Sequence, residues 1–177
     1  MEDFLIKVEK FAKKYYKQDP EDPKLWENHV QLVRKFALKL AEIEKADKQV
    51  VEIAALLHDI GKHKGRENHN VISYELAKEF LKELNLDQNK KNLILKCILK
   101  HGSKYSSEDN EIEVKIIQSA DALGVLFDEE WQKKCRRYLS REEILKKFDK
   151  MLNKKINLDS ARKIATLQIK KLKRLLL

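Results

Sequence analysis

The sequence has few of the residues that interrupt helices, with 4 Gly and 2 Pro among 177 residues. This scarcity leaves little room for long loops or sheets. Two lone cysteines, Cys97 and Cys135, cannot form the disulfide framework of a small secreted domain. No apolar run approaches the ~20 residues of a membrane span, and the acidic start of the chain is unlike a signal peptide. We therefore expect a cytoplasmic protein without membrane contact.

Charge is abundant and unevenly placed. Charged residues make up 38% of the chain and hydrophobic ones 42%, a composition typical of a soluble, helix-rich domain. Residues 131–177 hold 16 Lys and Arg against 4 Asp and Glu, a net +12, whereas residues 1–130 carry −3. This split predicts a catalytic body formed by residues 1–128 and a basic helical extension formed by residues 129–177. The extension could attract RNA, or its lysines could simply line solvated helix faces.

Apolar residues recur at helical spacing along most of the chain, and no strand-like alternation stands out. We expect an all-α fold with helices over about 2–17, 23–44, 47–58, 70–84, 87–101, 111–126, from 140 onward, and 159–176. Asp22, Asp47 and Asp87 are candidate N-caps, and Ser140 with Glu143 forms a capping-box pattern. Residues 60–69 and 103–110 are predicted polar loops. Gly61 is expected to end its helix in a left-handed conformation.

Four polar residues in apolar helical segments are the strongest functional signal. His29 lies on the apolar stripe of its helix, His58 and Asp59 close the run Val50–Leu57, and Asp121 sits in mid-helix beside Ala120. Separately, a lone histidine is more often a core residue, and His-Asp at a helix end suits the dipole and a turn. A carboxylate on an apolar face, however, costs free energy unless it is paired or binds a cation. Together they predict one divalent metal site with Asp59 beside a metal-activated water.

Further polar residues extend this site. His69 and His101 could bind a second metal or hold a phosphate oxygen, and either could instead be an ordinary helix-end residue. Lys62, close to Asp59, is a candidate to neutralise phosphate charge, and Arg66 is a weaker one. Lys64 is expected to be a solvated charge.

Three more residues have simpler expectations. His63, among charged neighbours, should be exposed. We expect Cys97 to pack in the apolar core. Cys135, among Lys and Arg residues, could have a lowered pKa.

At these residues the chain resembles the HD superfamily of metal-dependent phosphohydrolases. The resemblance covers about residues 25–126 and rests on His29, the segment His58-Asp59-Ile60-Gly61-Lys62, His69, His101 and the segment Ser119–Leu123. It implies an HD-type helical bundle with His29, His58, Asp59 and Asp121 as metal ligands. It also implies His69 and His101 as candidate ligands of a second metal.

The absence of motifs that are typical of particular branches narrows the choice of branch within the superfamily. Lys62 stands where the deoxynucleotidases carry an acid, Lys62-His63 stand where guanosine-tetraphosphate hydrolases carry Glu-Asp, and the cyclic-di-GMP group's Gly-Tyr-Pro is absent. The chain resembles small stand-alone predicted HD hydrolases. Its layout is also similar to symmetrical dinucleoside-tetraphosphate hydrolases and to the HD domain of ribonuclease Y.

The expected function is hydrolysis of a phosphomonoester or phosphodiester, most plausibly of a nucleotide. Asp59 and Lys62 would act directly, with one or two ions of Mn, Fe, Co, Ni, Mg or Zn. The chain has no P-loop and no His-Glu-x-x-His. The alternative is an RNA- or partner-binding module that uses the basic C-terminal helices. The substrate and the oligomeric state stay open.

Overall fold

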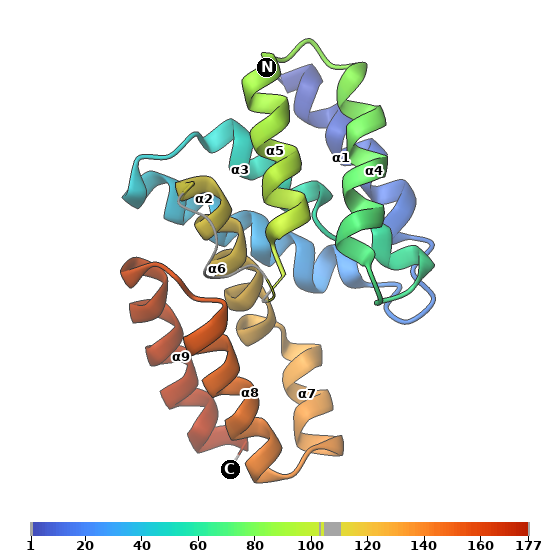
Figure 1. Ribbon diagram of the computed structural model, residues 1–177. Helices are drawn as coiled ribbons and strands as arrows, with labels where there is room; N and C mark the ends of the chain where they lie inside the picture. The colour runs from blue at the N-terminus through green and yellow to red at the C-terminus, as the bar shows by residue number, and fades with distance from the viewer. Residues whose placement is uncertain (1, 103, 105–110, 177) are drawn as a thin grey trace.

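The computed structural model describes residues 2–102, 104 and 111–176, and within that part the regular elements are all helical (Figure 1). The all-α prediction is confirmed. The long helices are α1 (Glu2–Tyr16), α2 (Gln31–Glu44), α3 (Lys48–Leu57), α4 (His69–Lys82), α5 (Gln88–Lys100), α6 (Ile112–Phe127), α7 (Glu129–Tyr138), α8 (Arg141–Lys154) and α9 (Asp159–Leu176). Two short elements join them: a π-helical turn, η1 (Trp26–Val30), and a 3-10 turn, η2 (Ile60–Lys64). Most of the predicted loop 103–110 lies outside the described residues.

Side-chain caps begin three helices where the sequence predicted them. The Asp47 carboxylate accepts hydrogen bonds from the backbone N–H groups of the first turn of α3, and Asp87 does the same for α5. Ser140 and Glu143 form a reciprocal capping box at the start of α8. These carboxylate and hydroxyl oxygens satisfy N–H groups that have no partner within the helix.

The second helix begins differently from the prediction. Asp22 closes a turn, because its carbonyl accepts from the Leu25 N–H at 3.0 Å and its side chain accepts from Lys24 N–H at 3.2 Å. The chain becomes helical only after this turn, and its first stretch is the π-helical turn η1. The prediction of a regular helix from Pro23 was therefore wrong at its start.

Gly61 does not end α3 in a left-handed conformation, and that prediction was wrong. The positive φ falls instead on Gly65, at 113°. A Cβ on Gly61 would lie 2.3 Å from the carbonyl oxygen of His69 and 2.7 Å from the backbone nitrogen of Ser73. Its N–H donates to the Ser73 hydroxyl at 2.8 Å. Gly61 is thus needed for the close approach of η2 to α4, and the predicted loop at 60–69 begins as a buried, ordered turn.

Helices α2 and α6 form the centre of the bundle (Figure 1). Helix α3 packs on α2 and on α5, and α4 packs on α5 and η2. The core is dense with branched apolar side chains, and Ile53, Leu56, Leu57 and Ile117 have no exposed surface. None of the described helices is both long and apolar enough to cross a membrane.

The basic C-terminal segment folds as three helices that continue from α6 (Figure 1). Helices α8 and α9 lie side by side, and α9 packs on α6, α7 and α2. Its buried face consists of Ala161, Ala165, Ile169 and Leu172. This face joins the same apolar cluster as the rest of the core, while the charges lie mostly on the outer side.

Candidate metal centre

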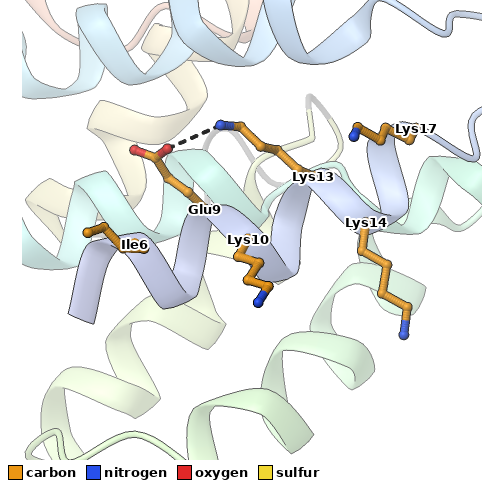
Figure 2. Close-up of a pocket in the computed structure, with 6 residues that line it drawn as sticks. All are labelled: Ile6, Glu9, Lys10, Lys13, Lys14 and Lys17. Carbon is orange, nitrogen blue, oxygen red and sulfur yellow. Dashed lines mark hydrogen bonds and ion pairs between the residues drawn. The ribbon is translucent and has the colours of Figure 1, made fainter. Parts of the chain in front are cut away.

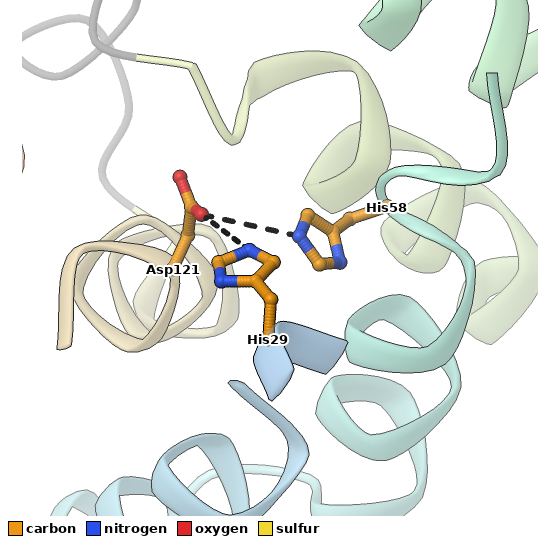
Figure 3. A group of neighbouring side chains, drawn as sticks. All are labelled: His29, His58 and Asp121. Atoms are coloured by element: carbon orange, nitrogen blue, oxygen red, sulfur yellow. Dashed lines mark ion pairs between the residues drawn. The ribbon is translucent and has the colours of Figure 1, made fainter. Parts of the chain in front are cut away.

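Three residues from separate elements meet in the buried interior. His29 comes from η1, His58 follows the last turn of α3, and Asp121 lies in the middle of α6 (Figure 3). His29 Nε2 lies 3.2 Å from Asp121 Oδ1, and His58 Nε2 lies 3.9 Å from the same oxygen. All three are buried, so their polar atoms are withdrawn from solvent. Such a set could hold a metal ion.

The local backbone explains how His29 reaches this point. A π turn shifts the side chains that follow relative to a regular helix, and such turns are frequent at functional sites. The Gln31 N–H donates to the Trp26 carbonyl, which closes the turn. On the facing helix, Gly124 leaves room for the ring, because a Cβ there would come within 3.2 Å of its Cε1 and Nδ1 atoms.

Asp59 lies between this group and a second one. Its Oδ2 is 3.2 Å from His58 Nε2 and 3.6 Å from His29 Nε2. Its Oδ1 faces the other way, 3.2 Å from His69 Nε2 and 3.5 Å from His101 Nε2. The structure thus brings together all six histidine and aspartate residues that the sequence singled out. The two oxygens of one carboxylate each face a different group.

Backbone carbonyls fix the orientation of three of the histidines. The Nδ1 atoms of His58, His69 and His101 lie 2.8, 2.7 and 2.7 Å from the carbonyls of Ala55, Arg66 and Ile98. A carbonyl can only accept, so each Nδ1 carries a proton and each ring turns its Nε2 toward Asp59. Metal-binding histidines are commonly oriented by this kind of bond.

Two of these Nε2 atoms then face each other. His69 Nε2 and His101 Nε2 are 3.1 Å apart. With both Nδ1 atoms protonated, two lone pairs point at one another, which is unfavourable unless a cation or an added proton lies between them. Burial lowers the pKa of His101 and outweighs the hydrogen bond to Asp59, which raises it. A metal ion therefore fits this pair better than a proton does.

Buried polar atoms without hydrogen-bond partners indicate whether a metal ion suits these groups. His29 Nε2 and His58 Nε2 in the first group, and Asp59 Oδ1 facing the second, are buried and have no hydrogen-bond partner of acceptable geometry. Buried polar atoms are normally satisfied, and leaving one unpaired costs about 1–3 kcal/mol. Two ligands each about 2.1 Å from one ion and at right angles to it lie about 3.0 Å apart. The separations of 3.2–3.9 Å in this group lie between this value and the ~4.2 Å of two ligands on opposite sides of one ion, so the residues fit a divalent metal.

Both carboxylates are held in the charged form. Burial alone would raise the pKa of Asp59, but His58, Lys62 and His101 outweigh it and hold that pKa well below its usual range. Burial acts on Asp121 in the same way, and its pKa is likewise held well below the usual range, chiefly by Lys155 and His29. Ionised carboxylates with neutral imidazoles are the donors that Mn, Fe, Co, Ni, Mg and Zn accept.

Lys155 is the residue of this site that sequence reasoning missed. It stands just after α8, and its ammonium bonds Asp121 Oδ2 at 2.5 Å. It mirrors Lys62, whose ammonium is in contact with Asp59 Oδ2. No motif marks Lys155, because it is one of many lysines in the C-terminal segment and comes 34 residues after Asp121.

Arg66 and Lys64 lie outside this centre. Arg66 is bound by the carboxylates of Asp19, at 2.7 Å, and Glu21, at 3.2 Å. Its charge is therefore largely matched already, although phosphate binding by Arg66 stays a prediction. Lys64 is exposed, as expected.

A small cavity of about 200 Å³ opens beside the metal centre. Its lining includes His29 and Lys62 of the centre, Arg66, Trp131 and Lys134 of α7, and the carboxylates of Asp22, Asp128 and Glu130. The cavity joins solvent to the buried groups. It provides a route by which a small anion could reach Lys62.

Two expectations about single residues are corrected. His63 is half-buried rather than exposed, because its Nδ1 meets the Ile60 carbonyl at 2.7 Å and its ring packs on Tyr15. Cys135 is buried, and burial raises the pKa of its thiol instead of lowering it. Its basic neighbours in sequence point outward on α7, so they do not act on the sulfur. Cys97 is buried between Ile94 and Ile98, and its packing role is confirmed.

A second hollow, of about 540 Å³, lies along the outer face of α1. It is lined by Ile6, Glu9 and four lysines: Lys10, Lys13, Lys14 and Lys17 (Figure 2). Lys13 reaches back to Glu9 at 3.4 Å, and the other lysine side chains project from the helix (Figure 2). This hollow contains no histidine or cysteine. Its chemistry is that of a basic surface and not of a metal site.

Fold and site together define an all-helical protein with a buried His/Asp centre suited to divalent metal. Residues 26–126 match the HD domain family. The chain belongs to the HD domain family, and the resemblance suggested by the sequence is confirmed.

Two individual proteins are similar to the chain. A predicted HD superfamily hydrolase from an uncultured Thermotogales bacterium has a similar solved structure, with a TM-score of 0.68 and 23% identity over 97% of this chain and 88% of that one. The tRNA (cytidine(56)-2'-O)-methyltransferase of Picrophilus torridus is 31% identical over 109 residues. That match covers 54% of this chain and 30% of the methyltransferase, so the chain spans under a third of that relative. The structural likeness includes the C-terminal helices.

Proposed function

We propose that the protein is a metal-dependent phosphohydrolase that cleaves a phosphomonoester or phosphodiester, with a nucleotide as the substrate class. The observation that carries this proposal is the position of Asp59, whose two oxygens face two separate groups of ligand atoms. A carboxylate between two such groups suits a pair of metal ions, an arrangement common in phosphatases and nucleases. The predicted HD superfamily hydrolase of similar fold is in line with it.

The residues of the centre would have separate roles in metal binding and phosphate binding. His29, His58, Asp59 and Asp121 would hold the first metal, and Asp59, His69 and His101 would hold a second metal or a phosphate oxygen. Bound metal supplies a water of lowered pKa and a Lewis acid for the phosphoryl group. Asp59 orients the attacking water. Lys62, in the lining of the small cavity, neutralises charge on the phosphate.

The size of the cavity bears on the substrate. About 200 Å³ is less than the ~300–1,000 Å³ of typical ligand pockets. It therefore suits a phosphate group and part of one nucleoside, with the rest of the substrate in solvent. Trp131 in the lining offers a surface on which a base could stack.

The test is hydrolysis of a panel of nucleoside monophosphates, 2′,3′-cyclic nucleotides, dinucleoside polyphosphates and short RNA. Each substrate is incubated with Mn²⁺, with a chelator, and with the Asp59→Ala protein. Lys64→Ala is the control, because Lys64 is exposed on the same η2 turn. We expect turnover that needs metal, is lost in Asp59→Ala and is kept in Lys64→Ala. A folded, metal-loaded protein without turnover on any substrate would contradict the proposal.

The second candidate function is RNA binding, favoured by one specific observation. The Picrophilus relative is named as a tRNA methyltransferase, and this chain has a basic C-terminal segment and the lysine face of α1. Phosphate contacts by lysines release counterions, so affinity for RNA should fall steeply with salt. Titration of labelled RNA at about 50 and 200 mM salt tests this. Absence of binding at the lower salt would remove the candidate.

A further inference from the structure

The turn between α8 and α9 is fastened to the metal centre from outside the matched HD region. Its backbone is fixed by Asn157, whose N–H donates to the Ser119 hydroxyl at 3.2 Å and whose side chain donates to Gln118 Oε1 at 2.7 Å. Ile156 and Leu158, on either side, are buried. The turn is therefore docked on α6 within one helical turn of Asp121, and this positions Lys155.

Lys155 and Lys62 occupy equivalent places on the two ligand carboxylates. Lys62 contacts Asp59 Oδ2, and Lys155 bonds Asp121 Oδ2 at 2.5 Å. The carboxylates are almost fully buried, with exposed side-chain fractions of 1% and 7%, whereas those of the two lysines are 18% and 23%. Both lysine side chains thus reach from partly exposed positions to the buried ligand carboxylates.

The chemistry of the ammonium suits a role beyond this one ion pair. An ammonium has three N–H donors, and Asp121 Oδ2 accepts only one of them. When Asp121 shares its charge with a metal, its hold on the ammonium weakens, and the remaining donors are well placed for a phosphate oxygen.

We propose that Lys155 is a substrate-binding residue of this centre, which holds an oxygen of the phosphate opposite Lys62. The inference rests on the proposed phosphohydrolase function and deepens it. It assigns to the C-terminal helices a direct part in the site: they supply one of its two phosphate-binding charges. Residues 26–126 alone would then form an incomplete site.

The experiment compares Lys155→Met and Lys155→Arg with Lys154→Met. Lys154 precedes Lys155 in the chain and is exposed, so its variant is a matched control. Calorimetry measures Mn²⁺ binding to each protein, and then inorganic phosphate binding to the Mn²⁺-loaded protein. We expect Lys155→Met to bind phosphate at least about tenfold more weakly while it binds Mn²⁺ as tightly as the wild type or more tightly, because a cation that competes for Asp121 is gone. Lys155→Arg should keep most of the phosphate affinity, and Lys154→Met all of it.

The outcomes separate this inference from the proposed function. Phosphate affinity within twofold of wild type in Lys155→Met overturns the inference, and so does a parallel loss of Mn²⁺ affinity, which would mean a structural role. Wild type that binds Mn²⁺ but no phosphate also overturns it. Wild type that binds phosphate through Lys155 but hydrolyses no phosphoester removes the hydrolase and leaves Lys155 as an anion-binding residue.

Discussion

Replacing Gly124 by alanine should weaken metal binding more than it weakens the fold. A Cβ at this position would lie 2.7 Å from Val33 Cγ2 and 3.2 Å from Nδ1 and Cε1 of His29. Atoms in favourable contact sit about 3.5–4.0 Å apart. Val33 is fully buried and its β-branched side chain is stiff. Part of the strain must therefore move His29 by some tenths of an ångström.

The expected loss of stability and the expected loss of metal affinity have different magnitudes. Alanine gains about 1 kcal/mol over glycine inside a helix, whereas overpacking a core costs about 1–3 kcal/mol. The net loss of unfolding free energy is thus about 0–2 kcal/mol. Changes that misplace a metal-binding histidine typically cost about 10- to 100-fold in affinity. We expect at least a tenfold loss for Mn²⁺.

Calorimetric titration with Mn²⁺ measures the affinity, and thermal unfolding in chelator measures the stability. Gly102→Ala is the control, because a Cβ there meets no atom within 4 Å. The double variant with Val33→Ala should regain stability lost to the clash with Val33 Cγ2, yet keep weakened metal binding. A Gly124→Ala protein that melts lower but binds Mn²⁺ within twofold of wild type would refute His29 as a ligand.

Three further predictions concern stability. Gly61→Ala should cost more than about 3 kcal/mol in urea unfolding, because its Cβ would meet the backbone oxygen of His69 at 2.3 Å, which cannot step aside; a loss below about 1 kcal/mol would contradict the packing. Asp47→Ala should cost about 1 kcal/mol near pH 7. Burial would raise the pKa of Asp47, but Lys90 and the helix N–H groups outweigh it and lower it. The stabilisation is therefore full above the unfolded-state pKa of about 3.9 and lost as pH falls through the lower folded value, so an unchanged difference at pH 2 would count against this cap. Deletion of residues 129–177 should abolish cooperative unfolding measured by circular dichroism, because it uncovers the apolar face where α9 packs on α6; a truncated protein as stable as the full chain would show that the extension is independent.

Periodicity and cap chemistry predicted most of the helices from the sequence, but not α7 with its Asp128 cap. Asp47, Asp87 and Ser140 begin helices where their side chains predict it, because a cap depends only on residues within one turn. The candidate ligands could also be selected, since a histidine or aspartate on an apolar helical stripe stands out against its neighbours. His29 and Asp121 are both identified by this contrast alone.

The remaining features depend on contacts between distant segments. Gly61 looked like a helix terminator, and only the position of α4 shows that it serves close packing. The thiol of Cys135 has basic neighbours in sequence, but helix geometry turns them away from it. Lys155 is indistinguishable from other lysines until α8 and α9 are placed on α6. In each case local sequence determines the element, and tertiary packing determines the role.

The metal centre lies at the C-terminal ends of two helices, and this affects the order in which metal and phosphate bind. His58 and His101 are the C-caps of α3 and α5, so both helices direct their carbonyl ends at the same place. A helix C-terminus carries about half a negative charge, the reverse of the N-terminal ends on which many proteins bind phosphate. Lys62 and Lys155 already match the charges of the two ionised aspartates, so the two helix ends are the unmatched negative charge at the centre and favour a cation over a bare anion. Binding should therefore be ordered, with metal first and phosphate only afterwards, so that metal supply acts as the switch for substrate capture.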